Sequence, residues 1–227
     1  MTFTVLARSA DGRSLGVASA TRTLSVGAGV PAAAPGVGVV ASQAWTNRAL
    51  RGVGLELMAR GLDPSAVLDR MARLDPRFDL RQVGLVTADG RVGVHTGSSC
   101  TGWAGARTGE GWVVMGNLLA GPGVVEAMAE VMATTEGPAA LGAPAFADLL
   151  VAALRAGDLA GGDSRGRQSA ALLVVDAAPP DEPSVPPETL VDLRVDDHPA
   201  PVEELGRLVS LVRAEAEGAE QARPAGG

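Results

Sequence analysis

The sequence predicts an α+β protein in which mostly antiparallel sheets are covered by helices, as in a four-layer αββα sandwich. Groups of strands alternate along the chain with groups of helices, and short turn signals join most neighbouring strands. The composition is that of a globular protein, with 46% hydrophobic and 20% charged residues. A chain of 227 residues can bury a core as one domain. We expect that domain to span residues 1–217, and a disordered tail to follow at 218–227.

The chain opens with strand signals. Residues 2–6 are rich in threonine and branched or aromatic side chains, and the Asp11-Gly12 pair is typical of a hairpin turn. Residues 15–20 then form the returning strand. A further short apolar run at 37–41 predicts a third strand.

Two helices follow these strands. Residues 50–58 carry apolar side chains at helical spacing, and Gly61 stands where a glycine ends a helix. Asp63 and Pro64 have the form of an N-cap and a first helical residue, and an apolar face continues to Leu74.

The remaining elements repeat this alternation. Two hairpins are expected, then two helices, two strands and a last helix. Their ranges are 83–86 with 92–94, 103–108 with 112–117, 123–135, 144–156, 169–176, 189–195 and 201–217. The acidic, proline-rich segment 177–187 is expected to be a loop.

Charge and composition exclude several classes of function. The net charge of -7 argues against a nucleic-acid partner, since phosphate binding needs clustered cations. All 19 basic residues are arginine, which excludes chemistry that needs a lysine amine. The single cysteine forms no intrachain disulfide, the first residues lack a secretory pattern, and no apolar run is long enough for a membrane span. We therefore expect a cytoplasmic protein with no membrane partner and no cofactor or metal.

The start of the chain offers a chemical feature. Methionine aminopeptidase in bacteria removes Met1 before a small residue, which would place a hydroxyl and a free α-amine together on Thr2. An α-amine titrates near pH 8. It can take the hydroxyl proton and so activate a threonine nucleophile. Many chains begin Met-Thr without any such role, so the dipeptide alone indicates little.

Longer segments resemble a known family. The opening through Arg22 is similar to the first strands of proteasome-like N-terminal-nucleophile hydrolases. More closely, the chain resembles the family called domain of unknown function 1028, which is assigned to that superfamily. The matching segments are TFTVLAR (2–8), VGAGVP (26–31), GVGVVASQAWTN (36–47), TGSSCTGWAGA (96–106), GNLLAG (116–121), GGDSRGRQSAALLVV (161–175) and VDLRVDDH (191–198).

The resemblance implies the N-terminal-nucleophile (Ntn) hydrolase-like fold, with Thr2 at its active end. The sequence departs from proteasome-type sites, which use a lysine and an aspartate near the nucleophile. This chain has no lysine, and its segment from Ser19 to Arg22 has no aspartate. Arg22 supplies positive charge but cannot act as a base. The fold is therefore better supported than peptide hydrolysis.

Three amide side chains are candidates to stabilise an oxyanion or hold a substrate. Gln43 and Asn47 follow a buried strand, and Asn117 ends another at a strand-to-helix corner. Amide N–H groups can stabilise the oxyanion of acyl transfer. The alternative is that they cap strand ends and turns.

A glycine-rich loop supplies another candidate group. In it, Asp163 could hold the terminal amine of Thr2, and Arg165 could bind a substrate carboxylate. Gln168 and Ser169 begin the next strand and are expected to bind substrate. The alternative is a structural Asp163–Arg165 pair.

Other groups are weaker candidates. A Cys100–His95 nucleophilic pair is conceivable from the sequence. His198 with Asp196 and Asp197 forms a compact acidic cluster, which is better explained as a solvated turn than as a metal site.

The leading hypothesis is hydrolysis of a small amide, such as a ureide, an acylamino acid or a short peptide. Thr2 would be the nucleophile, with Asn117 and Asp163 in the catalytic group. Arg22, Gln43, Asn47, Arg165, Gln168 and Ser169 would bind the substrate. The alternative is a non-catalytic ligand-binding or assembly protein on the same fold. An assembly protein would be expected to form a homo-oligomer.

Overall fold

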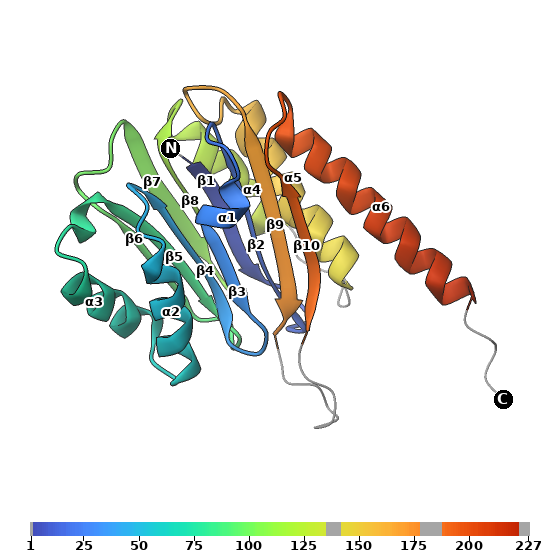
Figure 1. Ribbon diagram of the computed structural model, residues 1–227, viewed down its shortest axis with the longest axis horizontal. Coiled ribbons are helices and arrows are strands. Elements are labelled where there is room, and N and C mark those ends of the chain that lie inside the picture. The colour runs from blue at the N-terminus through green and yellow to red at the C-terminus, as the bar shows by residue number, and fades with distance from the viewer. Residues whose placement is uncertain (1, 135–141, 178–187, 223–227) are drawn as a thin grey trace.

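Two antiparallel sheets stack face to face in the computed structural model, which describes residues 2–134, 142–177 and 188–222 (Figure 1). The six-stranded sheet has the order β10-β9-β2-β1-β8-β7, and the four-stranded sheet has the order β3-β4-β5-β6. The strands are β1 (Thr2–Arg8), β2 (Ser14–Thr21), β3 (Pro31–Ala34), β4 (Gly38–Ala44), β5 (Arg81–Thr87), β6 (Val92–Thr96), β7 (Trp103–Gly109), β8 (Trp112–Leu119), β9 (Ser169–Asp176) and β10 (Thr189–Val195).

Helices cover the outer face of each sheet and complete four layers (Figure 1). The helices are α1 (Val26–Gly29), α2 (Ala49–Ala59), α3 (Pro64–Leu74), α4 (Gly123–Thr134), α5 (Ala143–Leu159) and α6 (Pro201–Ala222), with a short 3₁₀ turn, η1 (Phe78–Leu80). α2 and α3 pack on the four-stranded sheet, and α4, α5 and α6 pack on the six-stranded sheet. The predicted α+β αββα sandwich with antiparallel sheets is confirmed. Within the described ranges, no helix is both long and apolar enough to cross a membrane.

The strand β1 lies at the centre of the six-stranded sheet, between β2 and β8. Its side chains alternate between two faces, as the pleat requires. Phe3 and Val5 point toward the helices α4 to α6, whereas Leu6 points into the space between the sheets. By the same alternation Thr2 and Thr4 belong to the inter-sheet face, which places the first hydroxyl of the chain between the two layers.

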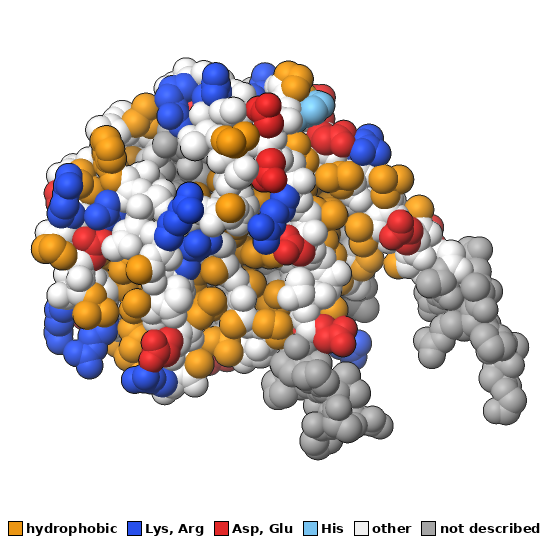
Figure 2. Space-filling view, in the orientation of Figure 1, with side chains coloured by type: hydrophobic (Ala, Val, Ile, Leu, Met, Phe, Trp, Pro, Cys, Tyr) orange, Lys and Arg blue, Asp and Glu red, His pale blue; other side chains and the backbone are white. Residues whose placement is uncertain are grey.

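Local signals set the helix boundaries as predicted. The side chain of Asp63 accepts a hydrogen bond from the Ser65 backbone N–H at 3.0 Å, and Pro64 is the first residue of α3. Gly61 has φ of +79°, the left-handed conformation that ends α2. Basic side chains gather around α1 on the face shown in Figure 2.

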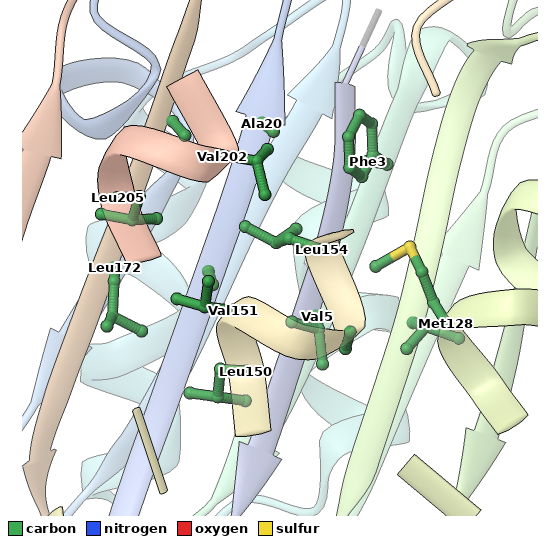
Figure 3. Close-up of a cluster of buried hydrophobic side chains, with 14 of the residues drawn as sticks. Phe3, Val5, Ala20, Met128, Leu150, Val151, Leu154, Leu172, Val202 and Leu205 are labelled. Atoms are coloured by element: carbon green, nitrogen blue, oxygen red, sulfur yellow. The ribbon is translucent and has the colours of Figure 1, made fainter. Parts of the chain in front are cut away.

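Three apolar clusters hold the layers together. The largest lies between the six-stranded sheet and its helices, where Phe3, Val5, Met128, Leu150 and Leu154 are fully or almost fully buried (Figure 3). A second fills the space between the sheets, and a third lies under α2 and α3. Removal of this apolar surface from water stabilises the sandwich.

Several boundaries differ from the prediction. The elements α1, β3 and η1 were not predicted, because each has four residues or fewer and shows no clear periodicity. The helix α6 continues to Ala222, so the predicted disorder at 218–227 is wrong for 218–222. Alanine, glutamate and glutamine favour a helix even where the composition is polar. Residues 135, 178–187 and 223–227, on which other predictions fall, lie outside the described residues.

Candidate active site

The hydroxyl of Thr2 stands at the floor of a cavity of about 340 Å³. Thr2 begins β1 and lies opposite Asn117 of β8, and its residue surface is 5% exposed. Its Oγ1 donates a hydrogen bond to Oγ1 of Thr21, at the end of β2, across 3.3 Å. The three central strands therefore place one buried hydroxyl at the base of an open pocket.

Two side-chain amides hold the backbone carbonyl of Thr2 from below. Nε2 of Gln43 donates to this oxygen at 3.2 Å, and Nδ2 of Asn117 lies 3.5 Å from it. The same two nitrogens donate to Oε1 of Gln82, at 2.8 Å and 3.1 Å respectively. Gln82 is thus the centre of a buried network that spans both sheets.

This network is saturated with hydrogen bonds. Nε2 of Gln82 donates to Oγ1 of Thr96 and to the carbonyls of Gly105 and Gly116, at 3.0, 3.1 and 2.9 Å. Oε1 of Gln43 accepts from Oγ1 of Thr4 at 2.6 Å. Buried polar groups are retained only when they are paired in this way. Amides and hydroxyls therefore position Thr2 from below.

The cavity walls include strained backbone. Among the described residues, only three that are not glycine have positive φ: Ser25 at 57°, Ala44 at 71° and Leu118 at 54°. All three line this cavity. Such conformations cost free energy and persist where the surrounding structure fixes them, which is common at functional sites.

The glycine-rich loop is fastened to the same end of the sheet. Asp163 forms an isolated bridge with Leu119, and its side chain is 1% exposed. Its Oδ2 accepts from the Arg22 backbone N–H at 2.8 Å, and its Oδ1 accepts from that of Arg165 at 2.9 Å. The Arg165 guanidinium also pairs with it, at 3.2 Å. This is the structural pair considered as an alternative, and it places the Arg165 side chain on the cavity wall.

Of the six predicted substrate-binding residues, five lie outside the cavity lining. Arg165 lines it, but Arg22 instead donates to Oε1 of Gln168 at 2.6 Å. Gln168 in turn donates to Asp197 at 3.1 Å. Ser169 donates to the Thr23 carbonyl at 2.5 Å and accepts from the Val26 N–H at 3.0 Å, so it anchors the start of α1. Arg22, Gln168 and Ser169 therefore lie outside the lining of this cavity, and their contacts with a substrate stay a prediction. Their partners come from sheet register, which local sequence does not show.

Gln43 and Asn47 also lie outside the cavity lining. The amide of Gln43 is fully committed beneath Thr2. Asn47 accepts from the Ala49 N–H at 3.1 Å, as the capping alternative predicts, and donates to Asp75 at 2.8 Å. Of the three amides proposed as oxyanion ligands, only Asn117 borders the cavity.

A buried ion pair supports the cavity wall at Trp45. Arg81 pairs with Asp75 at 2.8 Å and also donates to the carbonyl of Trp45, which lines the cavity. Hydrogen bonds from Arg81, against the opposing effect of burial, lower the pKa of Asp75 from 3.8 to about 2. The Asp75 carboxylate is therefore ionised wherever the protein is folded near neutral pH.

The family model described as "Family of unknown function (DUF1028)" matches residues 2–205. The chain belongs to this family. The crystal structure of protein SPO2555 from Silicibacter pomeroyi, of the same family, is 29% identical, covers 92% of this chain and 88% of that one, and superposes with a TM-score of 0.77. The resemblance that the sequence segments indicated is confirmed.

Two solved structures of Anbu are more distant from this DUF1028 protein. Anbu (ancestral beta-subunit) from Yersinia bercovieri is 12% identical over 99% of this chain and 98% of that one, with a TM-score of 0.43. The Anbu (Gly-1) mutant from Hyphomicrobium sp. strain MC1 is 13% identical over the whole of both chains, with a TM-score of 0.44. No curated protein matches the sequence.

Sequence reasoning missed three residues of the DUF1028 site: Gln82, Trp45 and Arg48. Gln82 is the second residue of β5, directly before the apolar run of that strand, and a fully buried amide there signals a polar network. Trp45 and Arg48 lie in the segment 36–47 or next to it, but nothing local shows that they border Thr2.

The weaker candidates do not form sites in this DUF1028 protein. The Cys100 thiol donates to the Arg81 carbonyl at 3.6 Å, and burial raises its pKa, which disfavours the nucleophilic thiolate. His95 instead stacks on Phe78, with ring centroids 4.1 Å apart. Nδ1 of His198 accepts from the Ala200 N–H at 3.0 Å, as a turn residue does. Within the described ranges, no three His, Cys, Asp or Glu side chains converge as metal ligands would.

Proposed function

We propose that this protein is an N-terminal-nucleophile amide hydrolase, in which Thr2 attacks a small amide after cleavage of the Met1–Thr2 bond. The observation that carries the proposal is the position of Thr2. Its buried hydroxyl stands at the floor of a cavity of about 340 Å³, on a backbone whose carbonyl is held by buried amides. This volume lies in the range of small-ligand sites.

The chemistry uses both groups of Thr2. Its freed α-amine accepts the Oγ1 proton, directly or through water, while Oγ1 bonds to the amide carbon. The C–N bond then breaks, and the ammonium group returns the proton to the departing amine. In the second step, water deprotonated by the same amine attacks the ester on Thr2. The acid leaves and Oγ1 regains its proton.

Asn117 is the proposed oxyanion donor. It borders the cavity, lies directly opposite Thr2 in the sheet, and its Nδ2 makes only a long contact of 3.5 Å with the Thr2 carbonyl. A side-chain N–H that is fixed in advance stabilises the charge that develops in the tetrahedral intermediate. The bond to Gln82 at 3.1 Å fixes the orientation of this amide.

The fixed geometry of Asp163 supports a positioning role. Its carboxylate is committed to the Arg22 and Arg165 backbones and to the Arg165 guanidinium. We propose that it holds the loop that forms one cavity wall and adds negative charge at the end of β1 and β8. In this scheme the base is the α-amine of Thr2.

A covalent probe tests the nucleophile without a known substrate. Purified protein is treated with a β-lactone, which acylates an activated hydroxyl, and intact and peptide masses are recorded. We expect processed protein to start at Thr2 and to carry one adduct there. Thr2→Ala should lose the adduct, while Thr108→Ala, at an exposed threonine of β7, should keep it. Retention of Met1, or an adduct elsewhere, would contradict the proposal.

The second candidate is a ligand-binding protein without catalysis on the same fold. It is favoured by the hydrogen bonds beneath Thr2, which join the side-chain amides of Gln43, Gln82 and Asn117, and by the absence of any lysine from the sequence. It predicts a processed Thr2 that no acylating probe labels. An assembly role predicts a homo-oligomer on sizing chromatography, and a clean monomer would count against it.

A further inference from the structure

The cavity above Thr2 differs in charge from the rest of the molecule. The chain as a whole carries a net charge of -7. The described residues that line the cavity include two arginines, Arg48 and Arg165, and no acidic residue. Since Arg165 is already balanced by Asp163, the uncompensated positive charge of the lining is that of Arg48.

Arg48 lies at the start of α2 and faces the cavity beside α1. Its guanidinium lies against Gly29, where an added Cβ would be 3.6 Å from Nη2. Within the described part of the chain, it forms no ion pair with a carboxylate. An exposed guanidinium at a cavity mouth, without an acid of its own, is suited to a planar anion.

Neighbouring charges strengthen this positive field. Arg51, one turn along α2, donates to the carbonyls of Arg48 and Pro31 and not to a carboxylate. Burial and the positive charges of Arg48 and Arg194 lower the pKa of Arg51. The space-filling view shows basic side chains around α1, with acidic side chains among them (Figure 2). Arg194 is balanced by Asp192 at 3.0 Å, so an anion at the mouth would relieve mainly the repulsion between Arg48 and Arg51.

The cavity mouth is also apolar. Leu24 and Trp45 line it, and each is 59% exposed, although large apolar side chains are usually covered. Among the described residues, six large hydrophobic side chains are exposed, and two of them border this one cavity. Trp45 is held in place through the Arg81 bond to its carbonyl. An apolar group of a ligand would find a preformed surface between these side chains.

We propose that the substrate is an N-acylated amino acid or short peptide whose free carboxylate binds Arg48. This inference rests on the proposed function. In such a molecule the carboxylate lies two bonds from the amide nitrogen, so an amide at Thr2 brings the anion toward the mouth. The apolar side chain then lies on Leu24 and Trp45. The cavity thus offers one partner for each group of the ligand: the Thr2 hydroxyl for the amide, Arg48 for the carboxylate, and the apolar mouth for the side chain.

Binding to Thr2→Ala protein tests the inference separately from catalysis. Alanine is also small enough to permit removal of Met1, so the variant starts at the same position. The probes are N-acetyl-leucine and its primary amide, which differ only in the carboxylate, and titration calorimetry measures both. We expect the acid to bind at least about 10-fold more tightly, as a charged hydrogen bond provides.

Arg48→Gln should abolish this preference, whereas Arg48→Lys should keep part of it because the charge remains. Arg70→Gln, at an exposed arginine of α3 far along the chain from the cavity segments, should keep all of it. Equal binding of acid and amide, or an unchanged preference in Arg48→Gln, would overturn the inference. Competition by inorganic phosphate with no preference for the acid would assign Arg48 to a different anion and overturn it as well. If Thr2→Ala prefers the acid while the β-lactone does not label the wild-type protein, the carboxylate site would be supported and the proposed hydrolase activity would be contradicted.

Discussion

Gln43, in the four-stranded sheet, donates a hydrogen bond across 3.2 Å to the backbone carbonyl of Thr2, in the six-stranded sheet. The bond crosses the space between the two layers. Gln82 adds a second crossing, since it lies in β5 and bonds to Asn117 of β8. The position of the Thr2 hydroxyl therefore depends on how the two sheets pack, as well as on the strand that carries it.

Removal of the Gln43 amide should loosen this connection. In Gln43→Leu, Thr4 and Gln82 each lose a buried partner, and an unsatisfied buried group costs about 1–3 kcal/mol. We expect a loss of that size in the free energy of unfolding, measured with urea, and a weaker β-lactone reaction at Thr2. Gln168→Leu, which removes a half-exposed amide outside the cavity, should cost less than about 1 kcal/mol. Equal losses of unfolding free energy in the two variants would show that the hydrogen bonds of Gln43 between the sheets do not contribute to stability.

Two glycines of α2, Gly52 and Gly54, allow a controlled test of how closely that helix packs. An added Cβ at Gly54 would lie 2.7 Å from Cε of Met71 and 3.1 Å from Cγ2 of Val40, whereas one at Gly52 would meet nothing within 4 Å. Gly52→Ala should stabilise the protein by about 0.5–1 kcal/mol through helix propensity. Gly54→Ala should destabilise it by about 1–3 kcal/mol through overpacking. Thermal unfolding of both variants measures the difference, and stabilisation by Gly54→Ala would mean that α2 is not packed as described.

The sequence predicts features that depend on neighbouring residues better than features that depend on sheet pairing. Asp63 and Gly61 act on the turns beside them, so their roles as helix cap and helix end could be predicted. Thr2 and Asn117 could be predicted to share a site because both lie in segments that resemble the family, and the structure places them opposite each other at one cavity. Gln82 could not be placed there, since its partners Gly116 and Asn117 are 34 and 35 residues away along the chain and meet it only when the two sheets stack.

The same reason explains why other candidate residues lie outside the cavity lining. Arg22 and Gln168 have side chains suited to a substrate, but strand register makes them partners of each other outside the cavity. Ser169 lies in the predicted strand, yet its hydroxyl is used to anchor α1. A side chain's chemistry shows what it can bind, and only its position in the fold shows what is within reach.

The strained residue Ala44 offers a test of the cavity wall. Its φ of 71° is unfavourable for a residue with a Cβ by about 1–2 kcal/mol. Glycine removes that cost but adds about 0.4–1 kcal/mol of unfolded-state entropy, so Ala44→Gly should stabilise the fold by up to about 1 kcal/mol. Ala66→Gly, on the exposed face of α3, should instead destabilise it by about 1 kcal/mol. Urea unfolding of the two variants should thus shift in opposite directions, and a shared loss would show that Ala44 is not strained.

The Asp75–Arg81 pair should contribute to stability against acid. The folded pKa of Asp75, about 2, lies below its ordinary value of 3.8, so its contribution is present above pH 3.8 and is lost as the pH falls toward 2. The difference corresponds to about 2 kcal/mol. Asp75→Asn should lose at least that amount at pH 7, and the gap to the wild type should narrow as the pH falls.

Urea unfolding between pH 7 and pH 2 measures this gap. Asp69→Asn is the control, since Asp69 is exposed on α3 and forms no ion pair in the described part of the chain. It should change the free energy of unfolding by less than about 0.5 kcal/mol. A constant gap at every pH would assign the loss in Asp75→Asn to packing and not to the charge.

The pH dependence of acylation should identify the base. If the α-amine of Thr2 accepts the hydroxyl proton, only its neutral form is active. The rate of β-lactone labelling should then rise with pH and level off above the α-amine pKa, about 7.7–8.0. A carboxylate base would give the same rise at the much lower pH where carboxyl groups ordinarily titrate. The two possibilities differ by several pH units and are readily separated by a rate profile from pH 4 to about 9.

Substitution of Asp163 completes this test. Asp163→Asn removes the charge beside Arg165 and keeps one acceptor oxygen, so it can accept from only one of the backbone N–H groups of Arg22 and Arg165. With the α-amine as base, the variant should keep a rising profile, displaced to lower pH because a negative charge no longer favours the ammonium form. Thr2→Ser should show the same profile as the wild type, since it keeps both groups. A rise in the labelling rate that vanishes in Asp163→Asn would transfer the role of base from the chain terminus to the loop.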